Sequence, residues 1–299
     1  MQGVINGYAP YQFGGLELVR MLTPFRPHQF LIGLAMLANE RFRFRPRLKI
    51  EQATLALSED LMGRTLWDRS QAYRFNPDAR YHYCPRLLRA PFYSSSWKSD
   101  RFEKYSIFVG NGSSPLKGAH FAVQALAQLK HQYPQARLYI AGRNPAQLGW
   151  RSLNRWVGYP AYLLKLIRHL GLEHDVVFTG PLDAKAVSER LAVSNVFVLP
   201  SQIENSPNSL AEAMIMGVPS VASYVGGVPS MARDERDALL YRANDPAMLA
   251  YQISRVFDND DLRSQLSRSS RERAQQVHAP ESIPKRIVSV YRDILSQAA

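Results

Sequence analysis

The stretch from residue 196 to residue 219 constrains the fold of this chain more than any other. It begins with four consecutive apolar residues, Val196–Leu199, a pattern typical of a fully buried strand in a parallel sheet. A loop and then a helix follow. Ser206 can cap the helix, Pro207 suits its first turn and Gly217 can end it. The sequence therefore predicts a strand–loop–helix unit of an open α/β sheet, with the helix over 206–216.

The start of that helix is a predicted anion site. Open α/β sheets bind ligands beyond the carboxyl ends of their strands, and a helix start offers N–H groups and a positive dipole end to phosphate. We expect residues 207–209 to present these groups. Glu204 lies just before the helix and Glu212 about a turn and a half inside it. Because a carboxylate can accept two hydrogen bonds from a ribose diol or from sugar hydroxyls, the pattern favours a phosphate flanked by sugars.

From about residue 105 onward, strand and helix patterns alternate, which predicts a parallel sheet covered by helices. The expected strands are 106–110, 137–141, 175–179, 195–199, 219–223 and 238–241. The expected helices are 118–132, 159–171, 183–193, 206–216, 246–257, 260–276 and 282–297. The first hundred residues are less regular: we expect a strand near 54–58, a helix near 65–74 and a strand near 80–84.

Several segments together resemble the family 4 retaining glycosyltransferases of GT-B fold. Glu204 and Glu212 match that family's Glu-x7-Glu signature. Ile107–Gly118 resembles its first donor-domain strand and lysine loop. The segments Leu138–Gly142, Val176–Gly180 and Val218–Gly227 follow in the family's order. The resemblance covers roughly residues 105–280, and Gly63-Arg-Thr-Leu-Trp-Asp-Arg69 matches a narrower branch.

This resemblance implies an α/β protein of GT-B type with three parts. Residues 1–104 would form a partial acceptor-side α/β domain, and residues 105–280 a Rossmann-like, doubly wound donor-binding domain. Residues 281–299 would form a C-terminal helix that crosses back to the first domain. Family members carry a larger first domain, so we expect the chain to begin inside it. Gln2 stands where many members have a histidine near the sugar.

The resemblance also implies roles for individual residues. Lys117 would stabilise the leaving diphosphate, and Glu204 would contact the donor sugar; these two are the predicted catalytic residues. Glu212 would hold the ribose diol, and Arg143, Gly180 and Leu182 would flank the base. The full set of predicted donor-binding residues is Gly110, Asn111, Gly112, Arg143, Gly180, Leu182, Asn205, Ser206, Pro207, Asn208, Ser209 and Glu212.

The implied function is transfer of a hexose from a nucleotide diphosphate sugar to a glycan or lipid-linked acceptor, with retention and without a metal or other cofactor. One departure leaves an alternative open. Family members usually have an arginine shortly before the lysine, whereas 110–114 reads Gly-Asn-Gly-Ser-Ser. The chain could therefore be a catalytically impaired pseudo-enzyme that only binds nucleotide sugars.

Other site classes find little support in the sequence. Asp258-Asn-Asp260 resembles an Asp-x-Asp metal motif, but helix capping explains it better, and the seven histidines show no metal-ligand spacing. No dinucleotide-binding glycine motif is present. A nucleotide-sugar epimerase or dehydrogenase would also need a Tyr-x-x-x-Lys pair, and the spacings of Tyr159 and Tyr162 to Lys165 do not fit.

Composition bears on location and on macromolecular partners. The single cysteine points to a reducing compartment, and we expect a cytoplasmic protein with no signal peptide and no spanning helix. The net charge is +12, and the densest basic patch is Arg41–Lys49. That patch could be a solvated face or could bind an anionic membrane surface peripherally. We recognise no nucleic-acid module and predict no nucleic-acid partner.

Overall fold

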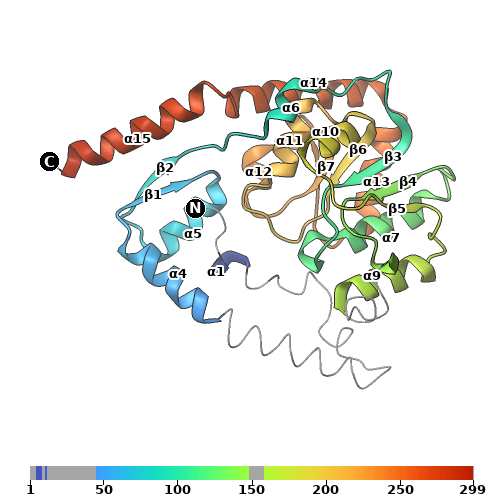
Figure 1. The fold of residues 1–299 in the computed structure, drawn as a ribbon, viewed down its shortest axis with the longest axis horizontal. Coiled ribbons are helices and arrows are strands. Elements are labelled where there is room, and N and C mark those ends of the chain that lie inside the picture. Colours follow the sequence, from blue (N-terminus) through green and yellow to red (C-terminus); the bar gives the residue numbers. More distant parts are fainter. Residues whose placement is uncertain (1–4, 9–10, 12–44, 148–157, 299) are drawn as a thin grey trace.

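A six-stranded parallel sheet forms the larger part of the molecule (Figure 1). The structure is a computed structural model that describes residues 5–8, 11, 45–147 and 158–298. The strands lie in the order β5-β4-β3-β6-β7-β8, the doubly wound order in which the connections reverse between β3 and β6. Their bounds are β3 Glu103–Val109, β4 Arg137–Ile140, β5 Val176–Phe178, β6 Ser194–Leu199, β7 Ser220–Ser223 and β8 Leu239–Tyr241. All six predicted strands are confirmed.

Helices cover both faces of this sheet, because its central strands are apolar on both sides. Ile107 and Val109 of β3 pack against α7 (Ala119–Leu129), α9 (Gly158–His169) and α13 (Pro246–Asp258). On the other face Phe108 packs against α6 (Ala90–Ser94), α10 (Ala184–Ala192) and α11 (Asn208–Met216). This alternation is the period-2 geometry of a strand. Both faces are therefore core, which explains the uninterrupted apolar runs of β3 and β6.

The seven helices predicted from residue 118 onward are confirmed to within a few residues at each end. Their bounds are α7 Ala119–Leu129, α9 Gly158–His169, α10 Ala184–Ala192, α11 Asn208–Met216, α13 Pro246–Asp258, α14 Asp260–Val277 and α15 Ser282–Ala298. Asn259 caps α14, since its side chain accepts a hydrogen bond from Leu262 N, so the capping interpretation of 258–260 is confirmed. The short α12, Val228–Met231, follows β7.

The first part of the chain forms a small α/β unit. It contains α1 Ile5–Tyr8, α4 Arg45–Leu57, β1 Asp60–Gly63, α5 Leu66–Phe75 and β2 Arg80–Tyr83, with β1 and β2 paired in parallel. The helix at 65–74 and the strand at 80–84 are confirmed. The strand predicted at 54–58 is wrong: residues 54–57 end α4, and among residues 46–57 of that helix only Leu55 is buried. A short apolar run is compatible with either a strand or a helix, so the sequence pattern alone could not decide between them. The strand β1 was not predicted from the sequence.

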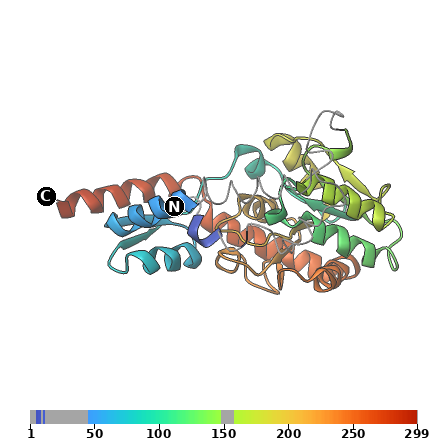
Figure 2. The ribbon, with the colours of Figure 1, turned by 90° about the horizontal axis from the view of Figure 1, so that it is seen from below.

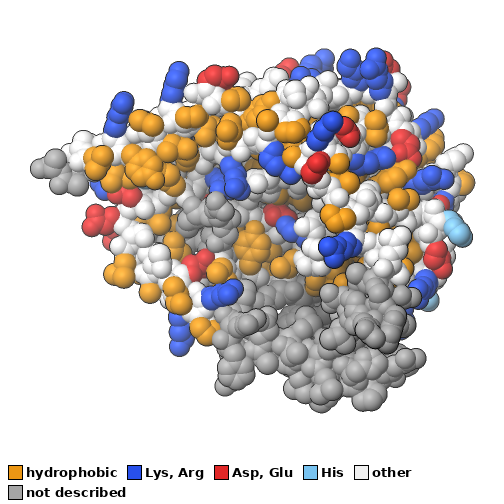
Figure 3. Space-filling view, in the orientation of Figure 1, with side chains coloured by type: hydrophobic (Ala, Val, Ile, Leu, Met, Phe, Trp, Pro, Cys, Tyr) orange, Lys and Arg blue, Asp and Glu red, His pale blue; other side chains and the backbone are white. Residues whose placement is uncertain are grey.

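Two elements connect the small unit to the large sheet. Between β2 and β3 lies α6, Ala90–Ser94, whose Phe92 is fully buried against the larger domain. At the other end of the chain, α15 runs alongside the small unit (Figures 1 and 2), with the Arg286 guanidinium 5.1 Å from the Tyr83 ring centre. Hydrophobic side chains gather along α15 on the face shown in Figure 3. Val288, Tyr291 and Leu295 of this helix are exposed.

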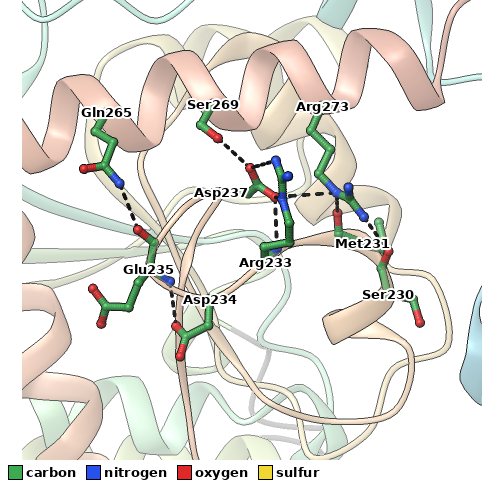
Figure 4. Close-up of polar contacts among 9 residues, drawn as sticks. All are labelled: Ser230, Met231, Arg233, Asp234, Glu235, Asp237, Gln265, Ser269 and Arg273. Carbon is green, nitrogen blue, oxygen red and sulfur yellow. Dashed lines mark hydrogen bonds and ion pairs between the residues drawn. The ribbon is translucent and has the colours of Figure 1, made fainter.

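An ionic network fixes the loop between α12 and β8 onto α14 (Figure 4). Asp237 is completely buried and accepts hydrogen bonds from Arg233 at 2.7 Å and from Ser269 at 2.6 Å. Arg273 donates to the carbonyl oxygens of Ser230 and Met231. Since Ser230 Oγ also accepts a hydrogen bond from Leu66 N, this network reaches the small unit.

Gln2 and residues 41–44 of the basic patch lie outside the described residues. Within the described residues, no helix combines the length and the apolar character that crossing a bilayer requires.

Candidate functional site

A cavity opens at the carboxyl ends of β3 and β6, the two strands between which the connections reverse. Its volume is about 600 Å³, including the open mouth. A cavity at this place in a doubly wound sheet suits a small-molecule ligand. It is lined by Arg89, Val109, Gly110, Asn111, Lys117, Val198, Leu199, Pro200, Ser201, Glu204, Asn208, Ser209 and Glu212. Seven of the predicted site residues are thus brought together.

Lys117 and Glu204 face each other across this cavity. Lys117 Nζ lies 2.6 Å from Glu204 Oε1, and Ser201 Oγ donates a hydrogen bond of 2.7 Å to the same oxygen. Glu204 is buried, whereas a third of the Lys117 side chain is exposed. The cation can therefore turn toward a ligand while the carboxylate stays where it is.

Close backbone contact between the loops that carry Lys117 and Glu204 fixes the position of this ion pair. Lys117 ends a short 3₁₀ turn, and Gly118 follows with φ +68°. A Cβ on Gly118 would lie 1.8 Å from the carbonyl oxygen of Pro200, so only glycine allows the approach. Gln202 N also donates to Leu116 O at 2.8 Å. The loop after β3 is therefore held directly against the loop after β6.

Glu212 lines the cavity from the first turns of α11. It is buried, and its two carboxylate oxygens accept hydrogen bonds of 2.8 Å from Nε and Nη2 of Arg89. The hydrogen bonds to Glu212 raise the pKa of Arg89, whereas burial lowers it. The hydrogen bonds have the larger effect, so the pKa of Arg89 lies above its ordinary value. Arg89 and Glu212 therefore form a bidentate ion pair, the strongest form of Arg–carboxylate contact.

The start of α11 differs from the prediction in two respects. Pro207 is the N-cap residue and no side chain caps the helix, so Ser206 is not the cap. Pro207 also has no N–H group, so it cannot present one to a phosphate; its carbonyl oxygen accepts from Leu210 N and Ala211 N. The helix start therefore offers the cavity Asn208 and Ser209 only.

The small unit holds the loop between Glu204 and α11. Thr65 Oγ1 donates to Asn205 Oδ1 at 2.9 Å, and the backbone N–H of Asn205 donates to Tyr8 Oη at 2.8 Å. Burial, together with the nearby charge of Glu204, raises the pKa of Tyr8 to about 12, so its hydroxyl stays protonated at neutral pH. The small unit thus positions the loop that follows β6.

The remaining predicted residues do not line this cavity. Gly112 packs onto Ile140, since a Cβ there would lie 2.4 Å from Ile140 Cγ2. Gly142 and Gly180 pair through two backbone hydrogen bonds of 3.0 and 3.1 Å, and Arg143 beside them is exposed. Leu182 packs against the core, and Ser206 lines a separate small cavity with Arg64 and His278.

Sequence reasoning missed four residues at or beside the site. Thr65 had a signal, because Thr65-x-x-Asp68 is a capping-box spacing and the structure forms that box. Ser201 lies two residues after the end of the predicted strand 195–199. Tyr8 and Arg89 carried no local signal, since their contacts to the site span 197 and 123 residues of chain.

Among known families, the group 1 glycosyltransferases match residues 103–259 of this chain. The D-inositol 3-phosphate glycosyltransferase of Acidothermus cellulolyticus is 33% identical over 195 residues, covering 64% of this chain and 41% of the relative. The N-acetyl-alpha-D-glucosaminyl L-malate synthase of Bacillus anthracis is 27% identical over 193 residues, covering 64% of this chain and 46% of the relative. The chain therefore spans less than half the length of these two relatives.

Solved structures show the same fold. The sucrose-phosphate synthase of Thermosynechococcus elongatus superposes with a TM-score of 0.71 at 24% identity, covering 86% of this chain and 64% of that chain. Anabaena HepE in complex with UDP-glucose gives a TM-score of 0.69 at 19% identity, covering 86% and 70%. The predicted GT-B fold class is confirmed, and with more than half of its length matched by the family, this chain belongs to the group 1 glycosyltransferases.

Proposed function

We propose that the cavity between β3 and β6 binds a nucleotide diphosphate sugar and that the protein transfers its hexose, with retention of configuration and without a metal, to a glycan or lipid-linked acceptor. One observation carries the proposal. Lys117, Glu204, Glu212 and the start of α11 line one cavity, so a cation, two carboxylates and free N–H groups face the same ligand. That combination suits a diphosphate flanked by two sugars.

In this proposal each group meets the part of the donor that its chemistry fits. The diphosphate lies against the N–H groups of Asn208 and Ser209, with Lys117 alongside. Glu212 accepts hydrogen bonds from the ribose hydroxyls, and Glu204 accepts them from the hexose. UDP-glucose in the HepE structure supports a donor of this class.

The reaction breaks the bond between the anomeric carbon and the diphosphate oxygen, and the bonding electrons leave with the diphosphate. The acceptor hydroxyl oxygen then bonds to the same carbon from the same face, and its proton passes to a phosphate oxygen of the leaving group. Negative charge therefore grows on the diphosphate, where Lys117 and the start of α11 stabilise it. No side chain is assigned as a nucleophile.

We also propose a cytoplasmic protein that associates peripherally with an anionic membrane surface, where a lipid-linked acceptor would lie. The support is the charge of +12 and the basic sequence at 41–49. Sedimentation with vesicles tests this directly. Binding to vesicles that contain phosphatidylglycerol, and not to neutral phosphatidylcholine vesicles, is the expected result.

Transfer assays test the main proposal. UDP- and GDP-sugars should be supplied with glycan and lipid-linked acceptors in the presence of EDTA, and the anomeric configuration of the product should be read by NMR. We expect a product with the configuration of the donor. A strict requirement for added divalent metal, or an inverted product, would overturn the mechanism.

The alternative is a pseudo-enzyme that binds nucleotide sugars without turnover. The loop Gly110–Ser114, which carries no charged side chain, favours it, because Lys117 then acts with less support. Calorimetry with UDP and GDP separates the two functions. Nucleotide affinity together with no transfer to any acceptor would support the pseudo-enzyme.

A further inference from the structure

Among the described residues that line the cavity, Arg89 is the one that precedes β3 in the chain. It is the N-cap of α6, the short helix between the small unit and β3. Its backbone is fixed on the C-terminal side by the fully buried Phe92. Tyr93 adds a second anchor, since its hydroxyl accepts a hydrogen bond from Leu88 N and donates one to His278 O.

The side chain of Arg89 is much freer than its backbone. Half of it is exposed, while only 3% of the Glu212 side chain is. The guanidinium lies 4.9 Å from the centre of the Phe92 ring and donates one hydrogen bond to each carboxylate oxygen of Glu212. Rotation about the side-chain bonds can therefore carry the charge into the cavity without moving the main chain.

The balance of charge explains why such a movement would be needed. In this structure each cavity carboxylate is paired with a cation, Glu204 with Lys117 and Glu212 with Arg89. The four groups sum to no net charge. A diphosphate brings about two negative charges into a partly dry cavity, where an uncompensated charge is costly. The cations have to leave the carboxylates before they can meet it.

We propose that Arg89 is a donor-exchanged cation. When a nucleotide enters, the ribose hydroxyls replace the guanidinium on Glu212, and Arg89 turns to bind the diphosphate beside Lys117. This inference rests on the proposed donor site. The planar guanidinium suits the task, because it can hold two phosphate oxygens at once. Arg89 would thus supply from α6 the second cation that the loop 110–114 lacks.

The exchange predicts opposite effects on a nucleoside and on its diphosphate. A nucleoside has to displace Arg89 from Glu212 and offers it nothing in return. In Arg89→Met, uridine or guanosine should bind at least as tightly as in wild type, while UDP or GDP should bind at least tenfold more weakly. The nucleoside Kd divided by the nucleoside diphosphate Kd, both measured by calorimetry with the preferred base, should therefore fall tenfold or more. Arg89→Lys should give an intermediate ratio.

A second pair of variants guards against misfolding, because Arg89→Met leaves Glu212 buried without its partner. In Glu212→Gln the guanidinium is already free of a carboxylate. Adding Arg89→Gln to that variant should weaken binding of the nucleoside diphosphate tenfold or more and leave the affinity for the nucleoside unchanged. An unchanged ratio in either comparison would overturn the exchange while the donor site stands. If wild type bound neither UDP nor GDP, the donor site itself would fall.

Discussion

Lys117 Nζ and Glu204 Oε1 lie 2.6 Å apart although 87 residues separate them in the chain. The pair joins the loop after β3 to the loop after β6, so the opposite charges neutralise each other before any ligand enters. In the proposed reaction the donor separates them, because the diphosphate attracts the ammonium and the hexose hydroxyls take the carboxylate. The charge that Lys117 meets then grows as the bond breaks.

Lys117 should therefore act more on the transition state than on the ground state. We expect Lys117→Ala to lower kcat roughly 10²-fold or more, by analogy with the loss of one oxyanion-type donor, and to weaken nucleotide diphosphate binding by less. Initial rates at saturating donor and calorimetric affinities measure the two effects. Lys130→Ala is a matched control, since Lys130 pairs with Asp175 at 2.8 Å outside the cavity. If Lys117→Ala kept the wild-type kcat, Lys117 would be an ordinary solvated lysine with no part in catalysis.

The two carboxylates should separate binding from turnover. Glu212→Gln should weaken nucleotide binding by ~1–3 kcal/mol, the range for a lost hydrogen bond to a charged group, and should weaken the nucleoside as well. Glu204→Gln should lower turnover more than nucleotide affinity. Glu235→Gln is the control, because Glu235 pairs with Arg255 on the surface. Unchanged nucleotide affinity in Glu212→Gln would show that Glu212 does not hold the ribose.

The large domain was predictable because its signals are local. The run Val196–Leu199 is apolar on both faces, which identifies a central parallel strand, and Gly217 and Pro219 mark where α11 has to stop. The small unit lacks such signals. Among residues 46–57 of α4, Leu55 is the only buried one, and a helix segment with one buried residue has no periodic apolar stripe to recognise.

The site was predictable where a motif carries its geometry and not where the fold does. Glu204 and Glu212 lie on either side of one helix start, so their spacing alone brings them together. Arg89 reaches Glu212 only because α6 packs against α11. The family resemblance implied that Arg143, Gly180 and Leu182 flank the base, yet Gly180 pairs with Gly142. The sequence position of a residue after a strand does not predict a local pairing of this kind.

Acid should weaken the fold through Asp237. Burial raises the pKa of this carboxyl, but hydrogen bonds from Arg233 and Ser269 outweigh it, and the pKa lies below its ordinary value. A carboxyl of this kind stabilises the fold above its unfolded pKa, and the contribution is lost as pH falls through the folded pKa. Asp237→Asn should lower the free energy of unfolding at neutral pH by about 1–3 kcal/mol, and this difference should shrink below pH ~4.

Denaturant unfolding of both proteins over a range of pH measures this difference. Asp100→Asn is the control, because Asp100 is exposed and should leave the stability unchanged at every pH. A gap between wild type and Asp237→Asn that stays constant into acid would mean that the charge of Asp237 adds nothing to the fold.

Gly226 should matter for activity through the backbone of Glu204. Its φ is +49°, and an added Cβ would lie 2.0 Å from the carbonyl oxygen of Glu204. In Gly226→Ala the loop that carries Glu204 has to shift, and a displacement of about 1 Å at a positioned group can lower turnover on the order of 10²-fold. Gly171 is a matched control, because its φ is +67° but no atom lies within 4 Å of the added carbon.

The comparison isolates the close approach from the backbone strain. Both alanine variants carry the cost of a left-handed residue, about 1 kcal/mol, so both should unfold at slightly lower denaturant concentrations. Only Gly226→Ala should lose turnover, and it should do so at saturating donor, because Glu212 and the start of α11 are untouched. Equal turnover in the two variants would show that the Glu204 loop absorbs the extra carbon, and that the position of Glu204 is less demanding than the proposed chemistry requires.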